Sequence, residues 1–456
     1  MRLLVACLLA AGTAAAQDPR ALARDIFRQL IEINTTDSAG SVTRASEAMA
    51  ERLRAAGYPD RDLQVLGSDD RHRNLVLRLH GTGSARPLLF NAHFDVVEAR
   101  REDWSFDPFT FLERDGFFYG RGTQDDKECA AALVAAFIRL RQEGFRPARD
   151  LILALTGGEE GGTGNGVAWL LANRPDLIDA EYSINVDSGG GEARGGRPRV
   201  LVVVTSEKLY HTLFLDVKNK GGHSSLPEKD NAIYRLAAAL GRVADFEFPA
   251  RLSETTRAYL EKMSRLESGP AADDLKAATT GDAAAIARLS RSPWYNAQMR
   301  TTCVATEISG GHAENALPQS AHAAVNCRIL PVDDPAEIER TIRRIVNDPA
   351  VVVTARRTPP PSPASPLRPD VMAGLERAAS AVWPGVPVVP VMETGGTDGR
   401  MLRAAGIPTY GETGMFIDEG DIRAHGRDER LRVESYYQGC EFLYRLLTEL
   451  GKQESR

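Results

Sequence analysis

The 456-residue sequence predicts an α/β fold in which a first domain is interrupted by an inserted α+β domain. Three observations support this prediction. Short apolar runs alternate with helical patterns in the first part of the chain, which is typical of a largely parallel sheet with connecting helices. The pattern changes after Thr205, and the alternation resumes after a proline-rich segment at 358–363.

The elements of the first part follow from the spacing of their apolar residues. A helical pattern covers 19–57, where Ile26, Leu30 and Ile31 share one face and Gly57 is a stop signal. After residue 57, short apolar runs favour strands. We expect strands at 74–79, 87–91 and 151–155, and helices at 129–141 and 166–172.

The block after Thr205 contains a different set of elements. The proline-rich segment that follows it is typical of a domain boundary. We therefore divide the chain into a signal segment (1–16), a first domain (17–209 and 358–456) and an inserted domain (210–357). In the insertion we expect strands at 213–217, 301–308, 322–330 and 351–354, helices at 232–243 and 335–346, and a charged, mostly helical stretch at 249–289.

Composition excludes several classes of protein. Lysine and arginine number 56 against 62 acidic residues, a net charge of −6 without a long basic run, so no nucleic-acid footprint is expected. Apart from the N-terminus, no stretch approaches the ~18 apolar residues of a membrane span. Arg2, the apolar residues 3–11 and the small residues 14–16 predict a signal peptide that is cleaved before Gln17. The mature protein is therefore expected to be secreted or periplasmic.

The cysteines allow at most a few disulfide bonds. Of the five cysteines, Cys7 lies in the predicted signal segment, which leaves four. An oxidising compartment permits disulfide bonds, but four cysteines in so long a chain do not form a disulfide framework. Cys303 and Cys327 lie in neighbouring apolar segments and are the best candidates for a pair, but the sequence leaves open whether they form a disulfide. No two cysteines have CxxC spacing, so a metal site built on cysteines is not expected.

Five clusters of polar residues lie at the ends of apolar runs. Loops at the carboxyl ends of strands in an open α/β sheet converge on one crevice, so these clusters would bring two imidazoles and several carboxylates together. The clusters are 91–95, 119–127, 156–162, 184–189 and 424–429.

Carboxylates packed so closely repel one another unless cations neutralise them. Two divalent ions that share a carboxylate would do so, and together they could activate a water molecule. Imidazole nitrogens and carboxylate oxygens suit zinc, with manganese or cobalt as alternatives. In His93-x-Asp95 the carboxylate would orient the ligating imidazole. Of the adjacent Glu159 and Glu160, one would bind metal and the other act as general base.

Two other chemistries are disfavoured. The glycines at 162, 164 and 166 precede a helix but lack the G-x-G-x-x-G spacing, and Glu159-Glu160 would repel a pyrophosphate. The sequence also contains no G-x-S-x-G motif of a serine hydrolase.

At these residues the chain resembles the M20 family of dinuclear zinc metallopeptidases and deacylases. The segments 104–109, 115–116 and 119–122 match the stretch that precedes the bridging aspartate of that family. The resemblance covers nearly the whole mature chain. It implies a phosphorylase/hydrolase-like zinc-peptidase domain with an inserted lid domain that mediates dimerisation. M28 aminopeptidases share the ligand order without a lid, and the motifs in the insertion favour M20.

The resemblance assigns a role to each residue of the clusters. His93 and Asp187 would bind one metal ion, Glu160 and His425 the other, and Asp125 would bridge them. Asp125 is the matching position because it lies two residues before Lys127. Glu159 matches the general base, and Asp95 the residue that orients His93.

Further motifs match residues that contact the substrate. His223, in Gly221-Gly222-His223, matches a lid histidine that polarises the scissile carbonyl from a partner subunit. Asn315 matches a substrate contact, and Arg328 the arginine that grips a substrate carboxylate. Gly396 and Thr397 belong to a loop whose N–H groups and hydroxyl could bind a carboxylate.

The sequence departs from the family pattern in places. Glu128 and Cys129 replace the small glycines usual after the lysine, and Glu98 stands where proline is common. The 249–289 stretch enlarges the expected lid.

We therefore expect an exported hydrolase of amide bonds that acts on dipeptides or the C-terminal residues of small peptides. The alternatives are an N-acyl-amino-acid deacylase of the same family and an inactive binding protein that retains the fold. Homodimerisation through the lid fits the resemblance.

Overall fold

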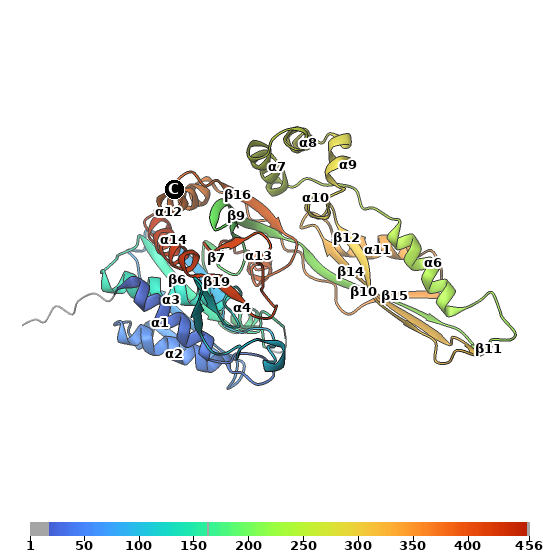
Figure 1. Cartoon of the computed structure of the whole chain (residues 1–456), viewed down its shortest axis with the longest axis horizontal. Helices are drawn as coiled ribbons and strands as arrows, with labels where there is room; N and C mark the ends of the chain where they lie inside the picture. The colour runs from blue at the N-terminus through green and yellow to red at the C-terminus, as the bar shows by residue number, and fades with distance from the viewer. Residues whose placement is uncertain (1–17, 162–163, 454–456) are drawn as a thin grey trace, which may run out of the picture.

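The computed structural model describes residues 18–161 and 164–453, and it contains two separate large sheets (Figure 1). The predicted signal segment lies outside the described residues. The larger sheet has the order β1-β2-β6-β3-β7-β17-β9-β8-β18, with β16 beside β9. Its strands are β1 (Leu63–Gly67), β2 (Arg73–Leu79), β3 (Ala85–His93), β6 (Arg149–Thr156), β7 (Tyr182–Asn185), β8 (Gly190–Arg194), β9 (Arg197–Glu207), β16 (Val388–Glu393), β17 (Thr409–Gly411) and β18 (Phe416–Asp418).

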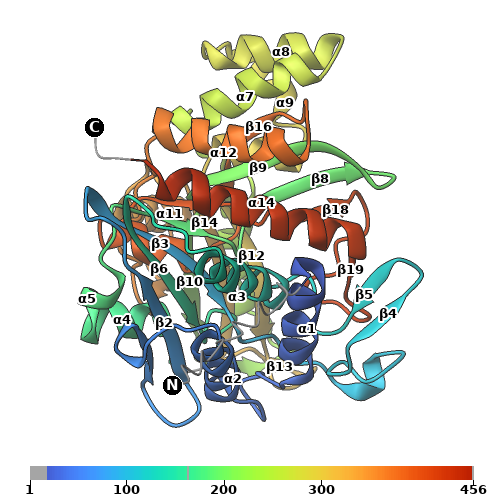
Figure 2. The same ribbon diagram turned by 90° about the vertical axis from the view of Figure 1, so that its left-hand side faces the viewer.

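The centre of this sheet is parallel and is covered on both faces. β3 pairs in parallel with β6 and β7, and β7 with β17. Leu75 and Leu77 of β2 belong to the core shared with α1, α3 and α14, whereas Val76 belongs to the core shared with α4 and α13. Figure 2 shows α1, α3 and α14 on the side of the sheet that is turned to the viewer. The helices are α1 (Pro19–Glu32), α2 (Val42–Ala55), α3 (Lys127–Gln142), α4 (Gly166–Asn173), α5 (Pro175–Ile178), α12 (Pro369–Val382), α13 (Gly399–Ala404) and α14 (Val433–Gly451).

The single helical pattern predicted over 19–57 is two helices. α1 ends at Glu32, and α2 begins after Ser41, whose side chain accepts from the Arg44 N–H as an N-cap. Minor elements complete this domain: η1 (Asp60–Asp62), η2 (Arg101–Asp103), and a small sheet of β4 (Leu112–Arg114), β5 (Phe117–Tyr119) and β19 (Arg430–Arg432).

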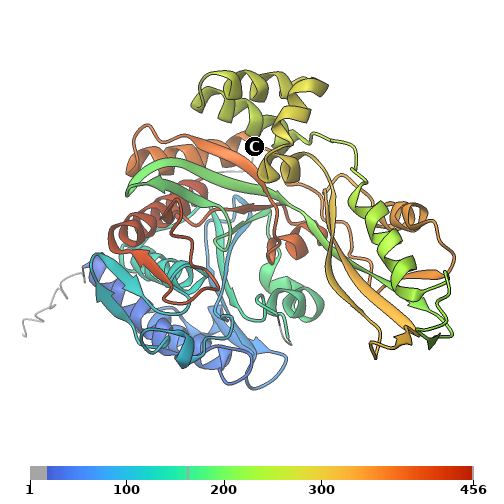
Figure 3. The same cartoon turned by 45° about the vertical axis from the view of Figure 1, so that its right-hand side comes forward.

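The second large sheet has the order β12-β14-β10-β15, and α6 and α11 pack on one face of it (Figure 3). The candidate pair Cys303 and Cys327, whose bonding the sequence left open, forms a disulfide that joins β12 to β14. The elements are β10 (Leu209–Lys218), β11 (Gly222–His223), α6 (Ala232–Ala244), β12 (Thr302–Gly310), β13 (Ala316–Leu317), β14 (Ser320–Ile329), α11 (Pro335–Val346) and β15 (Val351–Ala355).

The helical stretch between α6 and β12 does not enlarge this second domain, contrary to the sequence expectation. Tyr259 and Leu260 pack with Val204 and Val389 of the larger sheet, and Gln298 Nε2 donates to the Met392 carbonyl at 2.7 Å. Amphipathic spacing predicts that a helix has a buried face but does not specify its partner. The stretch consists of α7 (Glu254–Leu266), α8 (Pro270–Thr279), α9 (Ala283–Leu289) and α10 (Pro293–Met299).

Among the described residues, none of the helices is both long enough and apolar enough to cross a bilayer.

Candidate metal centre

The polar clusters converge at one edge of the larger sheet because its parallel strands end there. β3 ends at His93, β6 at Thr156 and β7 at Asn185, and each strand is followed by a loop with acidic residues. The α3 helix begins at the same edge, directly after Asp125 and Asp126. The topology therefore places residues from five parts of the chain around one point.

Asp125 lies between two imidazoles. Its Oδ1 is 3.1 Å from His93 Nε2, and its Oδ2 is 3.0 Å from His425 Nε2. His93 Nε2 is also 3.4 Å from Asp187 Oδ1, and His425 Nε2 is 2.9 Å from Glu160 Oε2. The cluster thus consists of two histidine–carboxylate groups that share one aspartate, which is the arrangement predicted for two metal ions.

The neighbouring Asp126 occupies a different place. Its Oδ2 accepts a hydrogen bond from the His93 backbone N–H at 3.0 Å, and the residue is 1% exposed at the N-cap of α3. Asp125 alone of the two therefore faces both imidazoles, in agreement with the assignment drawn from the family resemblance.

Burial and mutual repulsion dominate the electrostatics of the cluster. Burial, with the charges of Asp125 and Asp398, raises the pKa of Asp187 to about 7. Burial opposes the charged form of His93, but Asp187, Asp125 and Asp95 outweigh it and raise its pKa. Hydrogen bonds to Asp125 and Glu160 raise the pKa of His425 to about 10. These shifts indicate a surplus of buried negative charge that attracts positive charge.

The residues of the cluster fit two divalent cations. Asp187 Oδ2 is buried and has no hydrogen-bond partner among the described residues, and an ion would supply one. Ligand atoms of His93, Asp125 and Glu160 lie within 4.8 Å of one another. Two imidazoles and three carboxylates are donors that zinc, manganese and cobalt accept.

Asp95 positions two parts of the cluster. Its carboxylate accepts from the backbone N–H groups of Glu159 (3.3 Å) and Glu160 (3.0 Å) and lies 3.4 Å from His93 Nδ1. His93 Nδ1 is closer to the backbone carbonyl of Asp95, at 2.9 Å. Asp95 therefore holds the Glu159–Glu160 loop as well as the imidazole.

Glu159 is the predicted base, and no hydrogen bond of its carboxylate is present within residues 18–161 and 164–453. Burial, followed by the charge of Asp187, raises its pKa to about 9. Metal ions held by the five ligands would place positive charge near Glu159. This charge would lower the pKa of Glu159 again and favour the carboxylate form that a base needs.

The two motif residues at the end of the second domain lie together but away from the cluster. His223 belongs to β11 and Asn315 directly precedes β13, and the Ser224 N–H donates to the Asn315 carbonyl at 3.0 Å. Figure 1 shows β11 at the end of this domain that is remote from the larger sheet. The structure does not bring His223 or Asn315 to the ligand cluster of the same chain.

Arg328 lies at the opposite end of the second sheet, beside the larger domain. Its guanidinium stacks on the Tyr210 ring with 4.8 Å to the centroid, and burial lowers its pKa, with Arg400 as a charged neighbour. Arg328 therefore lies near α13, the helix that follows the loop containing Gly396 and Thr397.

Thr397 is engaged within the protein. Its N–H and hydroxyl both donate to the Glu207 carboxylate, at 2.7 and 3.0 Å, and its hydroxyl accepts from Asn185 at 2.8 Å. In this arrangement these groups hold the loop in place and are not directed at a substrate.

Sequence reasoning missed two buried groups that support the site. Asp398 accepts from Asn165 Nδ2 at 2.7 Å and so ties its loop to the segment after Glu160. Arg121 and Glu429 form a buried ion pair beside His425. Asp398 ends the motif at 395–398, and Arg121 and Glu429 belong to two of the predicted clusters, 119–127 and 424–429, but the sequence did not indicate that these two residues pair.

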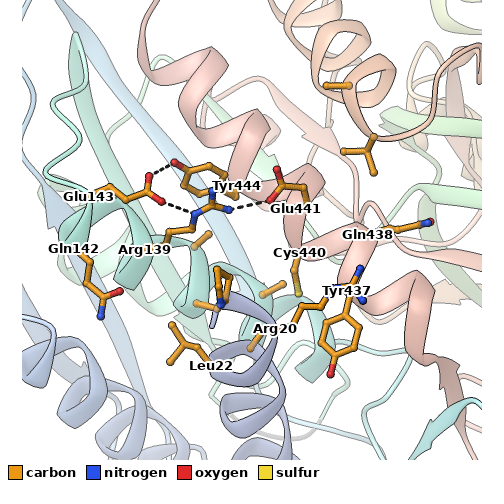
Figure 4. A pocket seen from close by; sticks show the side chains of 17 residues that line it. Arg20, Leu22, Arg139, Gln142, Glu143, Tyr437, Gln438, Cys440, Glu441 and Tyr444 are labelled. Atoms are coloured by element: carbon orange, nitrogen blue, oxygen red, sulfur yellow. Dashed lines mark hydrogen bonds and ion pairs between the residues drawn. The ribbon is translucent and has the colours of Figure 1, made fainter. Parts of the chain in front are cut away.

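A cavity of about 580 Å³ lies elsewhere, between α1, α3, α12 and α14 (Figure 4). Arg139 at its rim is already paired with Glu143 and Glu441, and Ala132, Ala135 and Ala136 form part of its wall. None of the predicted ligands lines this cavity, so we do not assign it to the metal centre.

The sequence model of Peptidase family M20/M25/M40 matches residues 89–449, which is most of the chain. The chain belongs to this peptidase family. The match begins just before His93 and ends in α14, so it includes all five candidate metal ligands.

Individual relatives agree with membership of M20. The human N-fatty-acyl-amino acid synthase/hydrolase PM20D1 is 31% identical over 80% of this chain and 74% of its own length. Aminoacylase-1 of Mus musculus is 25% identical over 93% of this chain and 94% of its own length.

Solved structures show the same fold. An M20 family metallo-carboxypeptidase from Sulfolobus solfataricus superimposes with a TM-score of 0.70 at 17% identity, over 94% of this chain and 99% of its own. A dinuclear metal-binding M20 peptidase from Bacillus subtilis superimposes with a TM-score of 0.61 at 12% identity, over 94% and 98%.

Proposed function

We propose that the protein is a dinuclear metal-dependent hydrolase of the amide bond between an acyl group and an amino acid with a free carboxylate. This class includes dipeptides and N-acyl amino acids. The observation that carries the proposal is the pair of histidine–carboxylate groups joined by Asp125. The similarity to an N-fatty-acyl-amino acid hydrolase and to aminoacylase-1 supports N-acyl amino acids, and the likeness to a metallo-carboxypeptidase supports peptides as the second candidate.

Two ions would be held by His93 with Asp187 and by Glu160 with His425, with Asp125 shared. When bound, they polarise the amide carbonyl and make water more acidic. Zinc is the metal that we propose, with manganese and cobalt as alternatives, because the five donors are imidazoles and carboxylates.

Glu159 would carry out the proton transfers. Its carboxylate takes a proton from the attacking water as the new C–O bond forms, and it returns this proton to the leaving nitrogen as the C–N bond breaks. Asp95 keeps Glu159 in place through the backbone N–H bond described above. The chain thus supplies a base that is oriented but not itself a metal ligand.

Residues at the junction of the two domains would orient the substrate. Arg328 would bind the free carboxylate of the amino acid with a planar pair of N–H donors. Gly396 would approach the same group through its backbone, while Thr397 holds the loop through Glu207.

His223 and Asn315 would act only after the second domain moves or when a second copy supplies them. We propose a homodimer in which His223 of one subunit completes the site of the other. Mixing Glu159→Gln with His223→Ala should then restore activity, because hybrid dimers contain one intact site. Mixtures without activity, from variants that each retain two metal ions, would remove this role of the second copy.

We also propose export, based on the N-terminal signal segment alone. N-terminal sequencing of protein from the periplasm or medium of the expressing bacterium should begin at Gln17. Recovery of the uncleaved chain from the cytoplasm would contradict this proposal.

A substrate panel tests the main proposal. Purified protein, stripped of metal and reloaded with zinc, manganese or cobalt, is assayed against free dipeptides and against N-acetyl, N-succinyl and long-chain N-acyl amino acids. Amide hydrolysis that requires metal and a free carboxylate supports the proposal. Stoichiometric metal binding without hydrolysis of any member of the panel would favour a binding protein that retains the fold.

A further inference from the structure

Three side chains at the start of α3 are left unused by the dinuclear arrangement. Asp126, Glu128 and Cys129 are 1%, 2% and 0% exposed, and an Asp126 oxygen also lies within 4.8 Å of ligand atoms of His93 and Asp187. One oxygen or sulfur atom of each lies within 4.8 Å of the others. Two carboxylates and a thiol thus share a small buried volume.

The two carboxylates are not satisfied by the protein. Asp126 Oδ1 and Glu128 Oε2 are buried and have no hydrogen-bond partner among the described residues. The remaining oxygen of Asp126 accepts from His93 N–H, whereas Glu128 Oε1 has only the Cys129 thiol, at 3.7 Å. Buried carboxylate oxygens are costly without a partner, so something outside the chain is expected to bind them.

A shared proton does not account for this arrangement. Two carboxyl groups that share a proton hydrogen-bond to each other, and no such bond joins Asp126 to Glu128 in the described structure. The backbone N–H groups at the start of α3 offer only partial positive charge. A cation in this volume would be within reach of one oxygen of each carboxylate and of the thiol sulfur, because one such atom of each residue lies within 4.8 Å of the others.

We propose that Asp126, Glu128 and Cys129 bind a third divalent transition-metal ion, distinct from the two of the dinuclear centre. Oxygen and thiolate donors together favour zinc or cobalt over magnesium or calcium. Cys129 would lose its proton to solvent on binding, because a coordinated thiol is deprotonated.

The charge balance allows a third ion so close to two others. The two carboxylates and the thiolate carry three negative charges, so a divalent ion leaves this group with one negative charge. It therefore does not add repulsion to the neighbouring cations. Glu128 and Cys129 stand where small glycines are usual, so the site belongs to this chain's own sequence.

Cobalt titration of the metal-free full-length protein tests the proposal. None of the five ligands of the dinuclear centre is a sulfur, so cobalt bound there produces no sulfur-to-cobalt charge-transfer band. We expect three cobalt ions per chain and an intense near-ultraviolet band. Cys129→Ser should abolish the band and lower the count by one, and Glu128→Gln should weaken binding of this ion at least ~10-fold, as the loss of one charged ligand predicts.

Cys440→Ser is the matched control, because Cys440 is the other free cysteine of the described chain and neighbours Cys129. This variant should retain the band. A wild-type protein that binds two ions without the band overturns the proposal, even if the Cys129 variant fails to fold, and leaves the dinuclear function intact. A third ion without the band, or a band that is lost only in Cys440→Ser, overturns it equally.

Discussion

We expect binding of the second metal ion, at Glu160 and His425, to depend on the buried ion pair between Arg121 and Glu429. The Arg121 side chain is 3% exposed and that of Glu429 is 0% exposed. Glu429 also accepts from the backbone N–H groups of Gly122 (3.3 Å) and Gln124 (2.6 Å). Arg121 in turn donates to the Gly426 carbonyl at 3.0 Å, so the pair ties the His425 loop to the segment before Asp125.

Glu429→Gln keeps the shape of the side chain but removes its charge. Removing one partner of a buried ion pair costs about 3–5 kcal/mol, because the other charge stays buried without compensation. The amide can accept from only one of the two backbone donors, and an unsatisfied donor adds about 1 kcal/mol. The sum, about 4–6 kcal/mol, is large against the ~5–15 kcal/mol that stabilises a typical protein.

The functional effect follows from the same contacts. Without the ion pair His425 is no longer held toward Glu160, and the loss of such supporting residues typically lowers metal affinity 10–100-fold. We expect urea unfolding of Glu429→Gln to show the lower stability, and competitive zinc titration to show one weakened ion and one unchanged.

Glu419→Gln is the matched control in the same C-terminal region. Glu419 pairs with Arg194 on the surface, with side chains 71% and 67% exposed, so its loss should cost less than about 1 kcal/mol. A Glu429→Gln protein with wild-type stability and two ions of unchanged affinity would refute the reasoning.

Three further predictions follow from single sites. Glu159→Gln should lower kcat at least ~10²-fold with two ions still bound, as measured by steady-state kinetics and metal analysis; unchanged turnover would eliminate the base role. The Cys303–Cys327 disulfide closes a loop with a sequence separation of 24, so a double serine variant should lose about 3 kcal/mol of stability, and an unchanged urea midpoint would contradict this. Burial lowers the pKa of His211 from 6.5, so the unfolded chain binds a proton that the folded chain resists, and stability should fall as the pH drops below 6.5. In His211→Gln this part of the pH dependence should disappear; a wild-type slope would show that other groups cause it.

The candidate ligands could be predicted from the sequence because they follow from topology. His93 and Asp187 each lie just after a short apolar run, and parallel strands end at the same edge of a sheet. For Cys303 and Cys327 the sequence indicated only a candidate pair in neighbouring apolar segments, and the structure shows that these segments are adjacent strands joined by the disulfide. Local sequence and the rules of strand pairing suffice for the ligands but not for this pairing.

What the sequence could not predict depends on contacts between distant segments. The Arg121–Glu429 pair joins positions 308 residues apart, and although both lie in clusters that were predicted to converge, the sequence does not indicate which side chains pair there. Thr397 was expected to face the substrate, but its donors bind Glu207, which lies in a strand with no local sign of this contact. The helices α7–α10 have clear apolar faces, yet their partner sheet could be identified only from the structure.

The position of these helices restricts how the second domain can move. α10 leads directly into β12, and Gln298 fixes its end to β16 of the larger sheet. Beside it, the buried Lys208 Nζ donates to the Arg300 carbonyl at 2.7 Å, where β9 passes into β10. Two of the chain crossings between the domains are thus joined at one point, so a rotation that carries His223 toward a metal centre must pivot there. Arg328 lies in β14, between β12 and β10, the two strands that follow these crossings. It would therefore move little in such a rotation. This fits its proposed role, in which it binds the substrate carboxylate before His223 reaches the site.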